Sequence, residues 1–327
     1  MQILFLLGNG FDLNLGMKTR YKDFYCHYLS VESKKEYVNK FKKHLSENLD
    51  NWSDLELSLG EYTQNIKTLE EFDDVFEDIA EKLADFLLEQ ENNFDFSKIL
   101  KEELHKCLIY PEQYLLNSDR NQLSEYKDRW SKNRWYVHII TFNYTRTLER
   151  ILGEEISNIK IGTHHDLAHV SLQGIDHLHG FVDERMIMGV NDKSQVKNVQ
   201  FHENPDVLEA IIKIQCNKAQ KHNVDDACIK RITTANLICI FGSSIGETDN
   251  YWWELIGNQL LVRDCHLIIF YKCEDISPRF AYKKARKERE IKNIFLSKTK
   301  LDENEKKLVE SKIFVGINTN LFKLNNS

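Results

Sequence analysis

The sequence has few prolines, no long apolar run and no patterned cysteines. Only 3 prolines occur among 327 residues. No stretch approaches the roughly 20 apolar residues of a membrane-spanning helix, and the apolar start lacks the basic residues of a secretory leader. The 7 cysteines include no Cys-x-x-Cys pair, which argues against a disulfide framework or a zinc ribbon and suits a reducing compartment. We therefore expect a cytoplasmic protein with no membrane partner.

The composition is that of a globular protein. Hydrophobic residues make up 42% of the chain and charged residues 29%, which argues against wholesale disorder. The formal net charge of −7 disfavours a general nucleic-acid surface, although it leaves room for a local basic patch.

The first twelve residues, MQILFLLGNGFD, organise the rest of the sequence. The apolar run Ile3–Leu7 is too short for a core helix, and Gly8 follows it, as expected for a strand buried on both faces of a parallel sheet. Gly8-Asn9-Gly10 then permits positive φ and a close approach of the backbone to a phosphate. Position 13 is Leu13, so G-x-G-x-x-G is incomplete, and an ordinary strand-to-helix turn is the alternative.

Similar apolar runs recur later in the chain and predict the fold class. The strand candidates are 135–141, 159–162, 170–172, 186–190, 235–241, 265–271 and 312–317. The helix candidates between them are 146–152, 205–220, 248–261 and 279–292. Strands that alternate with helices predict an α/β fold with a doubly wound parallel sheet and a site at the carboxyl ends of its strands.

The span from Ser30 to Arg134 has a different character. It is polar, nearly free of glycine and proline, and helical in period, most clearly from Phe72 to Leu87. We interpret 30–134 as a helical insertion after the first strand, packed as a lid or subdomain within a single domain of 1–327.

Three turns follow buried strands and should meet at one sheet edge: Gly8–Asp12, Thr141–Thr145 and Gly242–Ile245. A fourth segment, His177–Gly180, supplies histidine, the side chain best suited to acid–base work near neutral pH. Each segment taken alone also has a structural explanation.

Together the motifs carry a family resemblance. GNGFDLNLGMKTRYKDF, NWSDLE, TFNYTRTLE, HLHG, MGVND and FGSSIGETDNYW resemble, in the same order, the motifs of the AbiH family of bacterial phage-abortive-infection proteins. That family in turn resembles the Rossmann-like NAD-binding domains of sirtuins. The resemblance implies that Asn143 and His179 are catalytic, with Asn143 at the nicotinamide ribose and His179 as the base. It further implies contacts with the NAD phosphates from Gly8, Asn9 and Gly10, and with the adenosine from Gly242, Ser243 and Ser244.

Two positions depart from the sirtuin-like pattern. Thr145 stands where those domains usually have aspartate, and Asp12 stands where sirtuins often have serine. We keep both as ligand-binding candidates. We add Asp249, which would contact a ribose or, alternatively, cap the next helix. The four-cysteine zinc module of deacylating sirtuins is absent from the sequence, which disfavours peptide deacylation.

The resemblance implies an abortive-infection effector that binds NAD or a related nucleotide and hydrolyses it to nicotinamide and ADP-ribose. The alternative is a nucleotide-binding defence module without hydrolysis, acting through a protein or nucleic-acid partner. Activation by a phage-derived trigger or partner protein and assembly into a homo-oligomer are left open.

Two further clusters have competing explanations. Asp54 and Glu56 resemble part of the AbiH pattern, but Ser53-x-x-Glu56 is also a capping box. The histidine-rich stretch 164–179 invites a metal hypothesis, yet His165 and His169 lack the glutamate of H-E-x-x-H. We therefore expect no metal.

Overall fold

A seven-stranded sheet in the order β3-β4-β2-β1-β5-β6-β7 forms the centre of the molecule. The computed structural model describes residues 1–49, 52, 54–153, 156–164 and 168–324. The strands are β1 (Gln2–Leu7), β2 (Trp135–Thr141), β3 (Ile159–Thr163), β4 (His169–His177), β5 (Leu237–Phe241), β6 (His266–Tyr271) and β7 (Ile313–Ile317). All neighbouring pairs are parallel except β3 and β4, so only the edge strand β3 runs in the opposite direction.

The apolar run at the start of the chain forms the middle strand of this sheet. Ile3, Phe5 and Leu7 pack into a core on one face, whereas Leu4 and Leu6 pack into a second core on the other. This explains why the run does not alternate with polar residues: both faces of a central parallel strand are covered.

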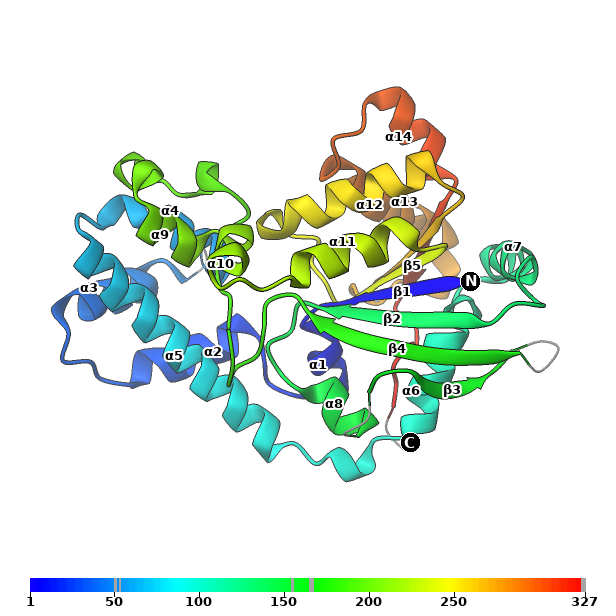
Figure 1. Cartoon of the computed structure of the whole chain (residues 1–327), viewed down its shortest axis with the longest axis horizontal. Helices are drawn as coiled ribbons and strands as arrows, with labels where there is room; N and C mark the ends of the chain where they lie inside the picture. Colours follow the sequence, from blue (N-terminus) through cyan, green and yellow to red (C-terminus); the bar gives the residue numbers. More distant parts are fainter. Residues whose placement is uncertain (50–51, 53, 154–155, 165–167, 325–327) are drawn as a thin grey trace.

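Helices supply both covers. Figure 1 shows α11, α12 and α13 on one side of the sheet and α1, α6 and α8 on the other. The helices are α1 (Gly10–Leu15), α2 (Tyr21–Ser30), α3 (Glu36–Glu47), α4 (Leu55–Tyr62), α5 (Leu69–Asn93), α6 (Lys101–Ile109), α7 (Asn117–Asp128), α8 (Thr147–Leu152), α9 (Pro205–Ile211), α10 (Lys213–Ala219), α11 (Val224–Thr234), α12 (Asn250–Val262), α13 (Ala281–Ser297) and α14 (Glu303–Glu310). None of the described helices is long and apolar enough to cross a membrane.

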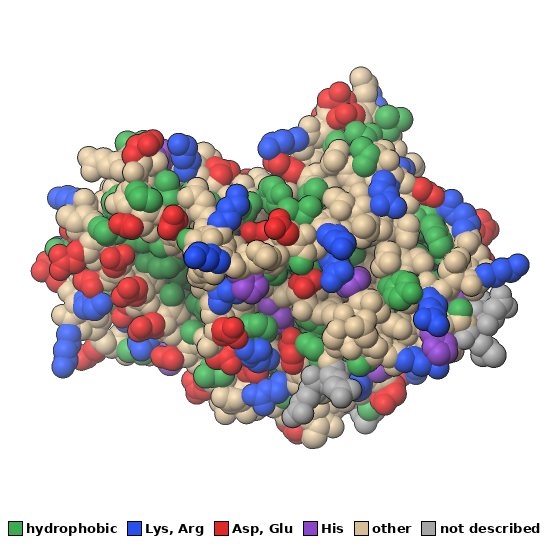
Figure 2. Space-filling view, in the orientation of Figure 1, with side chains coloured by type: hydrophobic (Ala, Val, Ile, Leu, Met, Phe, Trp, Pro, Cys, Tyr) green, Lys and Arg blue, Asp and Glu red, His purple; other side chains and the backbone are tan. Residues whose placement is uncertain are grey.

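Every element between β1 and β2 in the described chain is a helix, and these helices pack in two places. A third core joins Phe24 of α2, Phe41 of α3, Leu59 of α4 and Ile79 of α5 to Val207 of α9, at the left of Figure 1. In contrast, α6 and α7 pack onto the sheet. Figure 2 shows the surface indented between the helical part and the sheet part. The division into one domain with an insertion at 30–134 stays a prediction.

Two expected elements differ in the structure. The span 186–190 is not a strand: only Val190 pairs, in an isolated bridge with Ile212. The helix expected at 205–220 is broken at the same place, because Ile212 is extended and separates α9 from α10. The Val190 N–H donates to the Ile211 carbonyl and the Lys213 N–H donates to the Val190 carbonyl. The bridge therefore explains both differences.

Candidate functional site

The first and third predicted turns pack backbone against backbone. Gly8 N donates to the Phe241 carbonyl at 2.9 Å, and Gly10 N donates to the Gly242 carbonyl at 2.8 Å. A Cβ atom on Gly10 would lie 2.4 Å from Gly242 Cα, and Gly242 has a φ of +72°. Glycine is thus required at both positions, and the prediction that these turns lie together at the centre of the sheet is confirmed.

A cavity of about 1510 Å³ opens above this floor. Its volume exceeds the roughly 300–1,000 Å³ typical of small-molecule sites, so the space is large enough for a ligand bigger than a typical small molecule. The residues predicted from sequence to form a site all line this cavity: Gly8, Asn9, Gly10, Asp12, Asn143, Thr145, His179, Gly242, Ser243, Ser244 and Asp249. Tyr25, Trp52 and Leu87 also line it. The cavity is therefore lined both by the turns at the strand ends and by residues of the span between β1 and β2. Their roles in binding and catalysis stay predictions.

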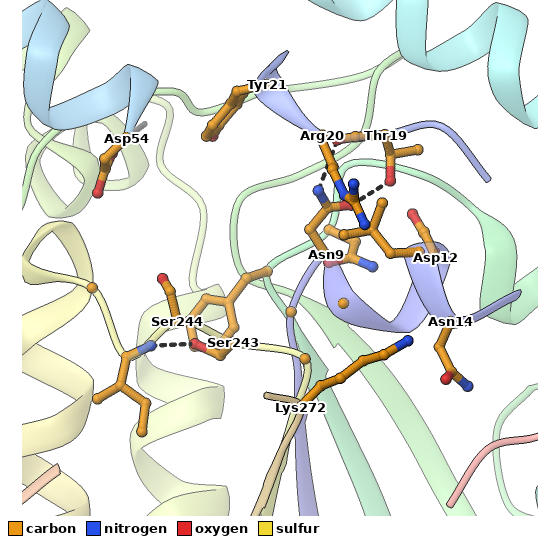
Figure 3. Close-up of a pocket in the computed structure, with 18 of the residues that line it drawn as sticks. Asn9, Asp12, Asn14, Thr19, Arg20, Tyr21, Asp54, Ser243, Ser244 and Lys272 are labelled. Atoms are coloured by element: carbon orange, nitrogen blue, oxygen red, sulfur yellow. Dashed lines mark hydrogen bonds between the residues drawn. The ribbon is translucent and has the colours of Figure 1, made fainter. Parts of the chain in front are cut away.

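Positive charge gathers near the glycine turn. Arg20 and Lys272 line the cavity, and neither forms an ion pair with a described residue. Figure 3 shows both on the side of α1, whereas Asp54 and Tyr21 lie across the space from Ser243 and Ser244. Two unpaired cations beside a glycine-rich backbone turn are suited to an anionic ligand such as a pyrophosphate.

Asp12 is a buried carboxyl at the floor of the cavity, with an exposed fraction of 1%. Its Oδ2 accepts a hydrogen bond from Thr145 Oγ1 at 2.6 Å, and Thr147 Oγ1 donates to Thr145 Oγ1 at 3.0 Å. Its Oδ1 has no hydrogen-bond partner. Burial raises the pKa of Asp12 to about 6, although Thr145, Thr147 and Asn143 act to lower it. Thr145 thus meets Asp12 directly.

Asp12→Asn is expected to stabilise the ligand-free protein at neutral pH. The folded-state pKa is about 6 against an ordinary 3.8, so the folded chain holds this proton more tightly than the unfolded chain. As the pH rises from 3.8 to about 6, ionisation of Asp12 therefore lowers the free energy of unfolding. The loss is about 3 kcal/mol at pH values above the folded-state pKa. Urea unfolding at pH 8 should show the gain, which should shrink towards zero near the ordinary pKa. A gain independent of pH, or one matched by the exposed control Asp275→Asn, would contradict this.

Asn143 follows β2 and is held by its backbone. Its N–H donates to Thr141 Oγ1 at 3.1 Å, and its carbonyl lies 3.2 Å from His177 Nδ1. The other ring nitrogen of His177 lies 2.8 Å from Glu149 Oε1. His177 therefore has both ring nitrogens engaged in fixing the turn. The side chain of Asn143 is left with an unpartnered Oδ1 although its exposed fraction is only 7%.

His179 belongs to a buried charge network. Its Nε2 lies 3.1 Å from Asp249 Oδ1, which also accepts from Lys213 Nζ at 2.9 Å. The same Lys213 Nζ donates to Glu56 Oε2 at 2.8 Å. Burial opposes the charge of Lys213, but Asp249 and Glu56 hold its pKa above the usual value. Burial likewise opposes the charge of Asp249, but Lys213 and His179 hold its pKa below the usual range. Asp249 is thus an ionised acceptor that fixes the ring of His179.

The network joins parts of the chain that are distant in sequence. Glu56 comes from α4, Lys213 begins α10, and Asp249 ends the short 3-10 helix Glu247–Asp249 after β5. Tyr144 adds a hydrogen bond from its hydroxyl to Glu56 Oε1 at 3.0 Å. Sequence reasoning missed Lys213; the available signal was a lone lysine inside the apolar run Ile211–Ile214.

The structure bears on the two capping alternatives, the Ser53-x-x-Glu56 capping box and the capping of a helix by Asp249. Ser53 lies outside the described residues; the observed N-cap of α4 is Asp54, whose side chain accepts from Leu57 N. Asp249 precedes α12 but makes no capping hydrogen bond there. Burial, followed by the charge of Glu56, raises the pKa of Asp54.

The histidine-rich stretch does not gather into one centre. His164 stacks on Trp135 with 3.8 Å between ring centroids, and His169 is exposed. No group of three His, Cys, Asp or Glu side chains in the described chain could hold a metal ion. His165 and Asp166 lie outside the described residues.

The chain matches a protein family. A family model described as "Bacteriophage abortive infection AbiH" matches residues 4–271. The matched span runs from β1 to the end of β6 and contains the whole network of Glu56, Lys213, Asp249 and His179. A search of curated proteins finds no match.

Proposed function

This chain belongs to the AbiH family of bacteriophage abortive infection proteins, and we propose that it binds NAD in a sirtuin-like site and hydrolyses it during that response. The supporting observation is that three turns and one histidine segment, predicted separately from sequence, line a single cavity at the carboxyl ends of the central strands. This is where open α/β sheets bind nucleotides.

The proposed pose follows the charges of the cavity. The pyrophosphate lies over the glycine turn, between Arg20 and Lys272. The adenosine extends towards Ser243 and Ser244. The nicotinamide riboside then lies near Asn143 and His179, on the side of the cavity that Asp249 lines.

Hydrolysis breaks the bond between ribose C1′ and the nicotinamide nitrogen. The electron pair goes to the cationic ring nitrogen, which becomes neutral, and C1′ develops oxocarbenium character. Asn143 orients the ribose or the attacking water. Water adds to C1′ and gives a proton to His179, so the products are nicotinamide, ADP-ribose and one proton. With hydrogen on Nε2 donated to Asp249, Nδ1 of His179 is the atom that accepts that proton.

Nicotinamide release from NAD tests the proposal. Purified wild-type protein is expected to bind NAD by calorimetry and to release nicotinamide. Asn143→Ala should lower the rate about 10²-fold, because a misplaced ribose or water loses the reactive geometry, and should leave the thermal unfolding temperature nearly unchanged.

Asn198→Ala serves as a matched control, because Asn198 caps the 3-10 helix Val199–Glu203 and does not line the cavity. NAD binding without nicotinamide release would favour the non-hydrolytic defence module instead. No binding of NAD would overturn the proposal.

A further inference from the structure

Two acceptor atoms at the floor of the cavity have no partner. Asp12 Oδ1 and Asn143 Oδ1 are buried and unbonded, and both residues line the cavity. The Asn143 side chain acts to lower the pKa of Asp12, so the two side chains are neighbours. Buried polar atoms nearly always have a partner. A pair of neighbouring exceptions in one cavity therefore points to a ligand group that supplies the missing hydrogen bonds.

The surrounding side chains fix which atom of Asp12 is left for the ligand. Thr147 donates to Thr145 and Thr145 donates to Asp12 Oδ2. This chain of hydroxyl donors satisfies Oδ2 and holds the carboxylate plane, so Oδ1 is presented in a fixed position. An ionised carboxylate accepts hydrogen bonds and cannot donate them.

The chemical class of the ligand group follows. A carboxylate beside an amide complements a primary carboxamide, whose NH₂ donates and whose oxygen accepts. The Asn143 amide serves either atom, because rotating it by half a turn exchanges its donor and acceptor. A ligand carboxylate would bind poorly at this position, because it and the ionised Asp12 carboxylate would repel each other with no proton between them.

We propose that Asp12, supported by Asn143, selects a dinucleotide whose base carries a neutral primary carboxamide and rejects the corresponding carboxylic acid. The inference rests on the proposed function, since it places the nicotinamide end of the ligand at this floor. The inference adds that the site discriminates between NAD and nicotinic acid adenine dinucleotide, which differ only in carrying a carboxamide or a carboxylate on the base.

Calorimetry in the His179→Ala background tests the selection without consuming the ligand. Protein with Asp12 is expected to bind NAD at least about 10²-fold more tightly than nicotinic acid adenine dinucleotide, because the acid analogue leaves buried polar groups unpaired. Asp12→Asn keeps an acceptor for Thr145 and gains an NH₂ donor, so the preference should fall about tenfold or more, or reverse.

Two further arms make the outcomes distinct. Asp275→Asn alters another acid that lines the cavity but is exposed, and it should leave the preference unchanged. ADP-ribose, which lacks the base, should bind equally to protein with Asp12 and to the Asp12→Asn variant; weaker binding to the variant would assign the carboxylate to ribose hydroxyls and overturn the inference. Equal binding of both dinucleotides to protein with Asp12 overturns the inference alone. Failure to bind either dinucleotide overturns the proposed function as well.

Discussion

His179→Ala is expected to reduce NAD hydrolysis by about 10²–10⁴-fold, the usual effect of losing a general acid or base. The imidazole lines the cavity and its Nε2 lies 3.1 Å from Asp249 Oδ1, so its loss removes the proposed base. The fold should persist, because β4 ends before this residue and its strand pairing does not involve it. Nicotinamide release at saturating NAD measures the rate, and circular dichroism checks the fold.

His169→Ala is the matched control. His169 is exposed at the start of β4, whereas His179 follows the end of that strand. The loss of His169 should leave the rate within about twofold of wild type because surface substitutions are nearly neutral. If His179→Ala retained full activity while folded, the hydrolase assignment would fail.

Lys213→Met is expected to lower the free energy of unfolding by about 3–5 kcal/mol, the cost of breaking a buried ion pair from one side. Lys213 has an exposed fraction of 6% and binds both Glu56 and Asp249. Methionine keeps most of the length of the side chain but leaves Glu56 and Asp249 without the lysine cation. Urea unfolding at neutral pH measures the loss.

Lys300→Met is the control, because it removes a lysine charge from a surface ion pair instead of a buried one. Lys300 pairs with Glu254 at 2.8 Å, but its side chain is 83% exposed, so Lys300→Met should cost only about 0–1 kcal/mol. Adding Glu56→Gln to Lys213→Met should recover part of the stability, because it removes one of the two orphaned charges. Equal losses for Lys213→Met and Lys300→Met would show that the network does not stabilise the fold.

The sequence predicted the strands well where an apolar run is buried on both faces of the sheet. The runs at 3–7, 135–141 and 265–271 are largely apolar, and each forms an interior strand of the sheet within one residue of the expected bounds. The turns after the strands at 3–7, 135–141 and 235–241 could be placed at one sheet edge because parallel strands share their carboxyl ends. That rule predicted where the three turns meet, whereas the roles of Asn143 and His179 were implied by the family resemblance.

What failed depends on contacts between distant segments. The pattern at 205–220 is helical throughout, but pairing with Val190 breaks it at Ile212. Lys213 binds Glu56 across 157 positions of sequence, a distance at which spacing carries no information. The meeting of Asp12 and Thr145 was equally hidden, since each was judged only as a departure from a motif.

The central position of β1 has a consequence for synthesis of the chain. The glycine turn emerges from the ribosome early, but its neighbours β2 and β5 begin at residues 135 and 237, and its floor contact is Gly242. At roughly 5–20 residues per second, the nascent turn waits on the order of 10–50 s for that contact. Until then neither the floor nor the Lys213 network exists, so a growing or prematurely terminated chain has no complete cavity. The glycine floor and the Lys213 network therefore form only after residues 237–249 have been synthesised.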